Sequence, residues 1–177
     1  MRRSYNDSGV IIKTLDAKEA DKVISIVTEN HGLVHYFAVG SRRSNSKKAP
    51  HLDLLTHLKL SASVSNHQNT LLQADSLAFF PELKQNLKKV GVAMSFLEIL
   101  SQLLPAEVED KEIYTSLVNF LTTLNSAEDR EIKALSSQFG SYLLRHLGYP
   151  PPSSLENNLS SYFETLMNRK IIGKEIS

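Results

Sequence analysis

The residues with the clearest chemical potential are four cations in the stretch AVGSRRSNSKKAP, residues 38–50: Arg42, Arg43, Lys47 and Lys48. The whole chain carries a formal net charge of only +1 at pH 7, so this cluster is a local feature. Like charges so close together repel one another, which indicates either a polyanionic partner or a turn that is stabilised by water alone. With a polyanionic nucleic acid, the four side chains would contact phosphates.

Other residues could extend such a surface. Arg2, Arg3 and Lys13 would continue the track of cations if the first apolar run lies beside the loop. Tyr36 and Phe37 are adjacent in an extended run, where successive side chains point to opposite faces. One of the two can therefore be exposed for stacking on a base, with Tyr36 as the candidate, although both could instead belong to the core.

The sequence offers little for catalysis. It contains no G-x-G-x-x-G, Walker A, G-x-S-x-G, H-E-x-x-H or EF-hand motif. There is no cysteine, and the six histidines are scattered; His51 and His57 are not at a recognised spacing for metal ligands. We therefore predict no enzyme activity, no catalytic residues, no metal site, no cofactor and no small-molecule substrate.

The composition indicates a globular protein. A chain of 177 residues with 41% hydrophobic residues can form one compact domain or two small ones. The lack of cysteine favours a reducing cytoplasm. The N-terminal residues lack the apolar core of a signal peptide, and no segment approaches the roughly 20 apolar residues that span a bilayer, so we expect a cytoplasmic protein without a membrane partner.

The first half of the chain has the pattern of β-strands. Short apolar runs, rich in β-branched residues, alternate with turn signals. The predicted strands are residues 9–14, 22–28, 33–39, 52–60 and 70–74. Gly32 can adopt positive φ and close a tight hairpin between the second and third strands. Five short strands with polar connections favour a small barrel; the OB-fold is the commonest of this size, and an SH3-like barrel also fits the strand count.

From Pro81 onwards, apolar residues recur at spacings of three and four, which predicts helices. The predicted helices are residues 81–104, 107–124, 126–147 and 155–169. The second is expected to open in an acidic stretch that suits a helix N-terminus, and the third with the capping-box spacing of Ser126 and Asp129. The predicted fold class is therefore α+β: a five-stranded OB-fold barrel at residues 1–78, followed by an all-α helical bundle at residues 79–177.

Several motifs resemble one known family. GVIIKT, EAD, ENHG and VGSRR, which begin at residues 9, 19, 29 and 39, occur in the same order and with similar spacing in the N-terminal domain of the RecO recombination mediators. LQAD at residues 72–75 is similar to the segment that ends the barrel in this family, and FGSYLLRHLGYP at residues 139–150 to its helix ending in Leu-Gly-Tyr and proline. The resemblance is strongest in residues 9–48 and 139–150 and covers most of the chain.

The chain also departs from the family pattern. Many RecO proteins carry a four-cysteine zinc site after the Leu-Gly-Tyr segment, whereas residues 151–177 contain no cysteine. The chain thus resembles a short form of the family without the zinc module. The usual start of the fourth strand is also replaced, by Ala49-Pro-His-Leu-Asp53.

The resemblance implies a non-enzymatic mediator of DNA repair and recombination. Such a protein would bind single- and double-stranded DNA, anneal complementary strands, and act with RecR-type and SSB-type proteins to load RecA, in the cytoplasm and in association with the nucleoid. Arg130, Lys133 and Arg145 on the predicted helices are candidate docking charges for an acidic partner, or solvated helix-face residues. The alternative is an OB-fold scaffold that acts through protein partners and binds little DNA.

Overall fold

A computed structural model of the protein describes residues 3–17, 19–150, 155–168 and 171. The backbone forms two compact units. One consists of Met1–Phe79 and Leu104–Thr115, and the other of Phe80–Leu103 and Ser116–Ser177. The chain therefore returns to the first unit after it has entered the second.

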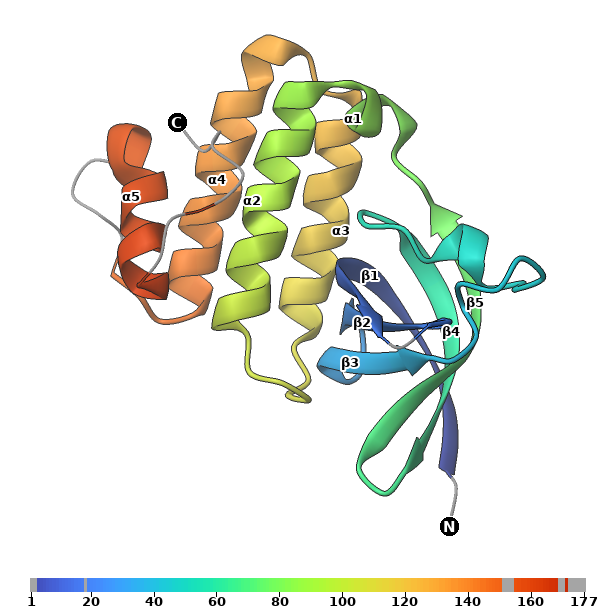
Figure 1. Cartoon of the computed structure of the whole chain (residues 1–177). Helices are drawn as coiled ribbons and strands as arrows, with labels where there is room; N and C mark the ends of the chain where they lie inside the picture. Colours follow the sequence, from blue (N-terminus) through green and yellow to red (C-terminus); the bar gives the residue numbers. More distant parts are fainter. Residues whose placement is uncertain (1–2, 18, 151–154, 169–170, 172–177) are drawn as a thin grey trace. The chain divides into compact units, whose positions relative to one another are not determined.

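The first unit is a closed barrel of five strands (Figure 1). The strands are β1 (Arg3–Ala17), β2 (Asp21–Thr28), β3 (Gly32–Ala38), β4 (His57–Ser65) and β5 (Gln68–Ala78). Their order around the barrel is β1-β2-β3-β5-β4, and all neighbours are antiparallel except β3 and β5. This is the arrangement of an OB-fold, so the predicted barrel is confirmed. Its interior is filled by buried side chains that include Ile24, Ile26, Tyr36, Leu58 and Leu71.

Left-handed backbone conformations close two of the hairpins. Gly32 has φ +66° in the turn between β2 and β3, as predicted, and its carbonyl accepts a hydrogen bond of 2.8 Å from the Thr28 hydroxyl. Asn66 and His67 both have positive φ and form the two-residue connection between β4 and β5. Two consecutive positive φ values are typical of the type I′ turn, whose twist matches that of the flanking strands.

The prediction of the fourth strand at residues 52–60 is wrong in its boundaries, because β4 begins only at His57. The preceding residues form a 3-10 turn, η1 (Ala49–His51), and then a connection in which Leu52 and Leu55 are both buried. The Leu55 N–H donates a hydrogen bond of 3.2 Å to the carbonyl of Ile11, where a bulge interrupts the pairing of β1 with β2. The leucines that alternate in residues 52–60 therefore do not all belong to one strand, because the first of them lie in a connection that packs on the bulge of β1.

A segment that follows the first long helix completes the barrel unit. Ala106 forms a parallel bridge with Leu33 on β3, and the Glu107 N–H donates to the Leu33 carbonyl at 2.8 Å. The side-chain amide of Asn69 on β5 donates to the Glu107 carboxylate at 2.7 Å. Sequence patterns did not predict this return of the chain, because the segment is acidic and has no strand alternation.

The second unit is helical. Its elements are α1 (Pro81–Gln85), α2 (Leu87–Leu103), the greater part of α3 (Lys111–Ser126), the 3-10 turn η2 (Asp129–Glu131), α4 (Ile132–His146) and α5 (Leu155–Met167). Helices α2, α3 and α4 lie side by side (Figure 1). Phe96, Phe120, Phe139 and Phe163 join these helices and α5 in one core, with ring centroids 4.2–6.4 Å apart. The helices in the described ranges are all too short or too polar to cross a bilayer.

The starts of the helices differ from the predictions, because side-chain caps decide them. The predicted helix 81–104 is divided at Asn86, whose side-chain oxygen accepts hydrogen bonds from the backbone N–H groups of Lys88 and Lys89 at 3.0 and 3.3 Å. Helix α3 begins at Lys111 and not within the preceding acidic residues, because the Asp110 carboxylate accepts the Ile113 N–H at 3.0 Å.

The predicted capping box of Ser126 and Asp129 is also wrong in its position. The capping box lies at Glu128 and Glu131, in the 3-10 turn before α4. After α4, Gly148 adopts φ +79°, so the predicted stop at this glycine is confirmed.

We expect Gly32→Ala to destabilise the barrel strongly. A Cβ atom at this position would collide with the carbonyl of Val108, and the positive φ disfavours any L side chain. Gly148→Ala is the matched control, since its φ is also positive but no atom lies within 4 Å of the added Cβ. The control should lose about 1 kcal/mol, and Gly32→Ala more than about 2 kcal/mol, measured by urea unfolding followed by circular dichroism. Equal losses would contradict close packing of residue 108 on this turn.

Acid should weaken the barrel in part through His57. Its Nε2 atom lies 2.9 Å from the Tyr114 hydroxyl, and burial lowers the pKa of His57 although the charge of Glu29 opposes the shift. The folded protein therefore takes up this proton less readily than the unfolded chain, so stability falls as the pH drops below about 6.5. His57→Gln should reduce the difference in melting temperature between pH 8 and pH 5, and an unchanged difference in this variant would refute the account.

Candidate nucleic-acid interface

The basic loop, residues 40–48, connects β3 to η1 and is folded against the turn between β1 and β2. The Gly40 N–H donates a hydrogen bond of 2.8 Å to the carboxylate of Asp21, and the Arg42 N–H donates one of 3.0 Å to the carbonyl of Ala20. Gly40 has φ +65°, which favours glycine at this position. These contacts fix the backbone that carries the clustered cations.

Lys48 has an internal role. Its ammonium group donates to the carbonyl of Val39 at 3.2 Å and to the carbonyl of Leu71 at 2.9 Å. Burial lowers the pKa of Lys48, and the nearby charge of Asp21 opposes this effect. Because two of the three ammonium donors are committed to carbonyls, Lys48 fixes the loop to Val39, which follows β3, and to β5. The phosphate contact of Lys48 that the sequence suggested stays a prediction.

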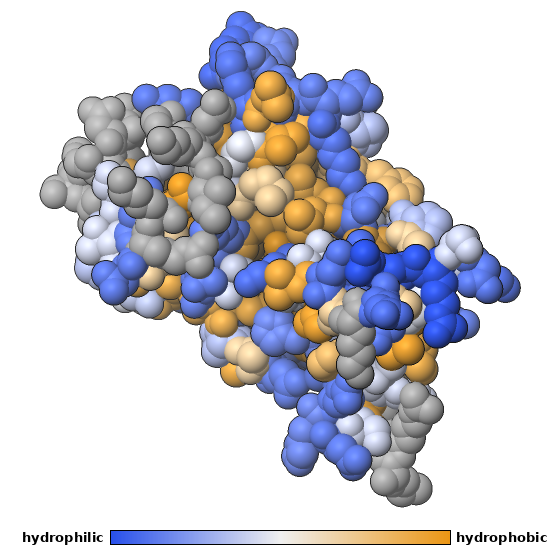
Figure 2. Space-filling model, in the orientation of Figure 1, coloured by the Kyte–Doolittle hydropathy of each residue, from blue (hydrophilic) through white to orange (hydrophobic). Residues whose placement is uncertain are grey.

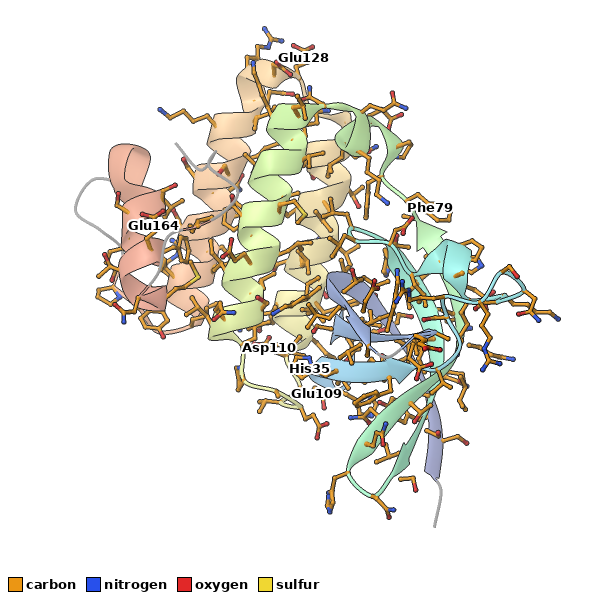
Figure 3. All side chains as sticks on the ribbon, in the orientation of Figure 1. His35, Phe79, Glu109, Asp110, Glu128 and Glu164 are labelled. Atoms are coloured by element: carbon orange, nitrogen blue, oxygen red, sulfur yellow. The ribbon has the colours of Figure 1, made fainter. Side chains whose placement is uncertain are left out.

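The other cations of the loop differ in their exposure. Arg42 pairs with Asp16 at 3.5 Å, so part of its charge is compensated within the protein. Arg43 lies over Gly40, with its side chain and that of Lys47 exposed to solvent. In Figure 2 the projecting loop at the right is largely hydrophilic, and in Figure 3 its side chains extend away from the barrel. Arg43 and Lys47 are therefore the loop cations best placed to contact a ligand.

A hollow of about 530 Å³, here called the loop groove, separates the basic loop from β5. One wall carries Arg43, Lys47 and Lys48, and the other is formed by residues 72–75 of β5. Leu72 is 39% exposed, because a register shift between β4 and β5 leaves it outside the regular pairing. The groove thus combines positive charge on one wall with an apolar side chain on the other.

A second hollow, of about 350 Å³, lies against the loop on the side of Asp16 and Lys22. Arg42 and Arg43 also line it, so Arg43 faces both hollows. The structure therefore brings the four cations of the basic loop together. They lie on two sides of the loop and do not form one continuous track.

The outer surface of β1, β2 and β3 presents two cross-strand rows. The pairing places Lys13, Ser25 and His35 in one row, in which Ser25 is buried and its hydroxyl lies 2.9 Å from His35 Nδ1. It places Leu15, Val23 and Phe37 in the next row, with exposed fractions of 52% for Leu15 and 37% for Phe37. His35 is labelled on β3 in Figure 3. This surface offers a cation and an aromatic ring on neighbouring rows.

The prediction that Tyr36 is the stacking aromatic is wrong, because its side chain is fully buried in the barrel. Its hydroxyl lies 3.0 Å from that of Tyr5, and burial raises the pKa of Tyr36. Its neighbour Phe37, which points to the opposite face, is the exposed ring. Phe37 was the other of the two rings that the sequence offered for stacking, and His35 was not selected, although a histidine on the same face as Phe37 indicates that this face is the outer one.

The remaining predicted cations are dispersed. Lys13 is exposed on β1, Arg3 begins β1 opposite Val64, and Arg2 lies outside the described residues. On the helical unit, Arg130 pairs with Glu128 at 2.8 Å. Lys133 and Arg145 are exposed near opposite ends of α4, which separates them by about 18 Å at 1.5 Å per residue. The three predicted docking charges therefore do not form one compact site.

Two family descriptions match consecutive parts of this sequence. "Recombination protein O N terminal" matches residues 1–80, and "Recombination protein O C terminal" matches residues 84–156. The order of the two matches agrees with the barrel and the helices described above. The chain belongs to the RecO family.

Curated relatives named DNA repair protein RecO agree with this assignment. The chain is 31% identical to the protein of Roseiflexus sp. (strain RS-1) over 149 residues, which are 84% of this chain and 52% of the relative. It is 28% identical to that of Symbiobacterium thermophilum over 83% of this chain and 58% of the relative, and 27% identical to that of Geobacter sulfurreducens over 79% and 57%. The chain spans about half the length of the curated RecO proteins it matches.

Zinc sites are not evident in the part of this RecO chain that the structure describes, where no group of three or more His, Cys, Asp or Glu side chains could hold a metal ion.

The candidate interface was only partly predictable. The Lys48 contacts and the bulge at Leu72 depend on carbonyl positions and on strand register, and neither has a signature in the sequence.

We expect Lys48→Met to loosen the basic loop. The substitution keeps most of the apolar stem but removes the ammonium that joins Val39 and Leu71, so backbone amides of residues 40–48 should exchange their hydrogens faster. Lys47→Met is the matched control, since the side chain of this neighbouring lysine is exposed to solvent and its loss should leave the exchange rates unchanged. Hydrogen exchange followed by mass spectrometry measures both. Equal protection in the two variants would show that Lys48 does not hold the loop.

Proposed function

We propose that this protein is a non-enzymatic mediator of DNA repair and recombination that binds nucleic acid through its barrel. The observation that carries the proposal is the loop groove, in which exposed Arg43 and Lys47 face the β5 wall. Membership of the RecO family supports it, since the relatives are named DNA repair proteins. OB-fold barrels bind single strands with cations that follow the phosphates and apolar or aromatic side chains that meet the bases.

In this proposal a single strand lies along the basic loop. Arg43 and Lys47 contact successive phosphates, and Arg42 contributes less because Asp16 shares its charge. Leu72 in the groove and Phe37 on the outer face of β3 provide apolar surface for the bases. Lys13 could extend the same surface from β1; Arg2 and Arg3 stay predictions.

The electrostatics of the groove suit weak and reversible binding. Asp75 lines it together with the cations, so the local positive charge is moderate. Annealing requires a surface that lowers the repulsion between two strands without holding either too firmly. We therefore propose that the protein binds single- and double-stranded DNA and anneals complementary strands, with no chemical step of its own.

The finer role follows the family resemblance. We propose that the protein acts in the cytoplasm, at the nucleoid, with RecR-type and SSB-type proteins in the loading of RecA. Exposed Lys133 and Arg145 on α4 are available for a partner, each on its own part of the helix. A scaffold that acts only through protein partners is the alternative, and the near-neutral net charge of +1 is what favours it.

The proposal predicts a change in the salt dependence of DNA binding. In the double variant Arg43→Ala/Lys47→Ala, the slope of log affinity against log salt concentration should fall by about 0.7 for each phosphate contact that is lost. Fluorescence anisotropy with a labelled single-stranded oligonucleotide measures the slope, and a fluorescence-transfer assay with complementary oligonucleotides should show slower annealing.

Lys133→Ala/Arg145→Ala is the control, because it removes the same two types of charge from exposed positions on α4. Its slope should equal that of the unmodified protein. A loss of slope in the control alone would move the DNA site to the helical unit, and absence of DNA binding by the unmodified protein at low salt would favour the scaffold.

A further inference from the structure

The barrel has another hollow, of about 660 Å³, that shares no lining residue with the two hollows beside the basic loop. We call it the barrel pocket. Its lining comes from the beginnings of β1 and β5, from β3 and the turn before it, from the end of β4 and the β4–β5 turn, and from the segment that follows α2. The residues that carry its chemistry are Tyr5, His31, Asn69 and Glu107.

One side of the barrel pocket is an aromatic pair that a buried carboxylate holds in place. The Asp7 side chain is fully buried and accepts hydrogen bonds from the Ser8 N–H at 2.8 Å, the Asn30 side-chain amide at 2.9 Å and His31 Nδ1 at 2.6 Å. The His31 ring lies on Tyr5, with centroids 4.3 Å apart. Because a carboxylate only accepts, His31 donates from Nδ1, and its ring plane is fixed beside the pocket.

The other chemical feature of the pocket is a carboxylate. Glu107 is exposed, and its Oε1 atom accepts the Asn69 amide at 2.7 Å, so the side chain is oriented by β5. The backbone of Glu107 is bonded to Leu33 at the start of β3. No Lys or Arg is found among the described residues that line the pocket. A phosphate is therefore disfavoured here, and a ligand that donates hydrogen bonds is favoured.

A nucleobase fits this combination of groups. Bases that are turned out of a single strand stack on Tyr or His rings and form hydrogen bonds along their Watson–Crick edges. A carboxylate accepts two parallel hydrogen bonds from two neighbouring donors. Guanine presents such donors, N1–H and N2–H, side by side, whereas adenine and cytosine place an acceptor beside their amino group.

We propose that the barrel pocket binds one unpaired guanine base, with its ring against the Tyr5–His31 pair and its Watson–Crick edge on the Glu107 carboxylate. This inference rests on the proposed function, because a bound strand supplies the base. It adds a preference for sequence that the phosphate contacts of the basic loop cannot give. Release of the base is then required before that guanine can pair with a complementary strand.

The test uses nucleosides, which have no phosphate, and the intact chain. Deoxyguanosine is titrated while the ring protons of tyrosine and histidine are followed by NMR. Its affinity should exceed those of deoxyadenosine and deoxycytidine by at least about fivefold, the lower range for a bidentate contact to a base. The 1-methyl derivative of deoxyguanosine, which lacks the N1–H donor, should lose this advantage. Equal affinities for all these nucleosides, or no binding, would overturn the proposal.

Variants assign the binding to the pocket. Glu107→Gln removes the carboxylate from an exposed position and should abolish the preference for deoxyguanosine. Glu109→Gln is the matched control, since Glu109 is exposed in the same segment, where Figure 3 labels it, pairs with Lys111 and is not among the residues that line the pocket. A preference that survives in Glu107→Gln, or is lost equally in both variants, would refute the assignment.

The test of the guanine site and the test of the proposed function can fail independently of each other. Arg43→Ala/Lys47→Ala should keep its affinity for deoxyguanosine, because neither residue lines the barrel pocket. If an oligonucleotide binds with the predicted salt slope but deoxyguanosine does not bind, the guanine site is rejected and the phosphate contacts stand. If deoxyguanosine binds selectively but the salt slope is unchanged in the double variant, the guanine site stands and the basic loop is rejected.

Discussion

The closure of the barrel between β3 and β5 is the constraint on which the candidate sites depend. These strands pair only at Tyr36–Asn69 and Phe37–Thr70, so most of the junction lacks a backbone ladder. The Lys48 ammonium joins carbonyls of the two strand regions on one side of this short contact. Glu107 joins β3 to Asn69 on the other side. Unpaired backbone groups at a strand edge need hydrogen-bond partners, so the contacts of Lys48 and of Glu107 both stabilise the closure of the barrel. Each of the two residues also belongs to the wall of a candidate ligand site.

The sequence predicted the type of each element better than its boundaries. Hydrophobic period and glycine position identified β2, β3 and the turn at Gly32, since those signals are local. The start of β4 was misplaced because Leu52, Leu54, Leu58 and Leu60 alternate in the sequence while the first two lie in a connection. Likewise, the predicted helix 81–104 is divided at Asn86 because the side chain of this one residue caps α2. The apolar residues keep their helical spacing across Asn86, so the spacing predicted one continuous helix.

The candidate interface shows the same limit. Charge clustering is visible in the sequence and correctly indicated a loop that carries Arg43 and Lys47 on its surface. It could not distinguish these residues from Lys48, because the distinction depends on two carbonyl groups, one of them from a strand far along the chain. For Tyr36 and Phe37, the two-residue period of a strand placed the side chains on opposite faces but did not show which face was inside. The barrel pocket brings together residues 5, 31, 69 and 107, and no local sequence pattern relates these four positions.

The return of residues 104–115 to the barrel unit has a consequence for the order of folding during synthesis. Strands β1 to β5 all leave the ribosome before residue 107, but the contact of Glu107 with Leu33 and Asn69 cannot form until α2 has also been made. Domains usually fold in order as the chain emerges. In this protein the edge of β3 at Leu33 therefore lacks its partner from residues 106 and 107 until α1 and α2 have been synthesised.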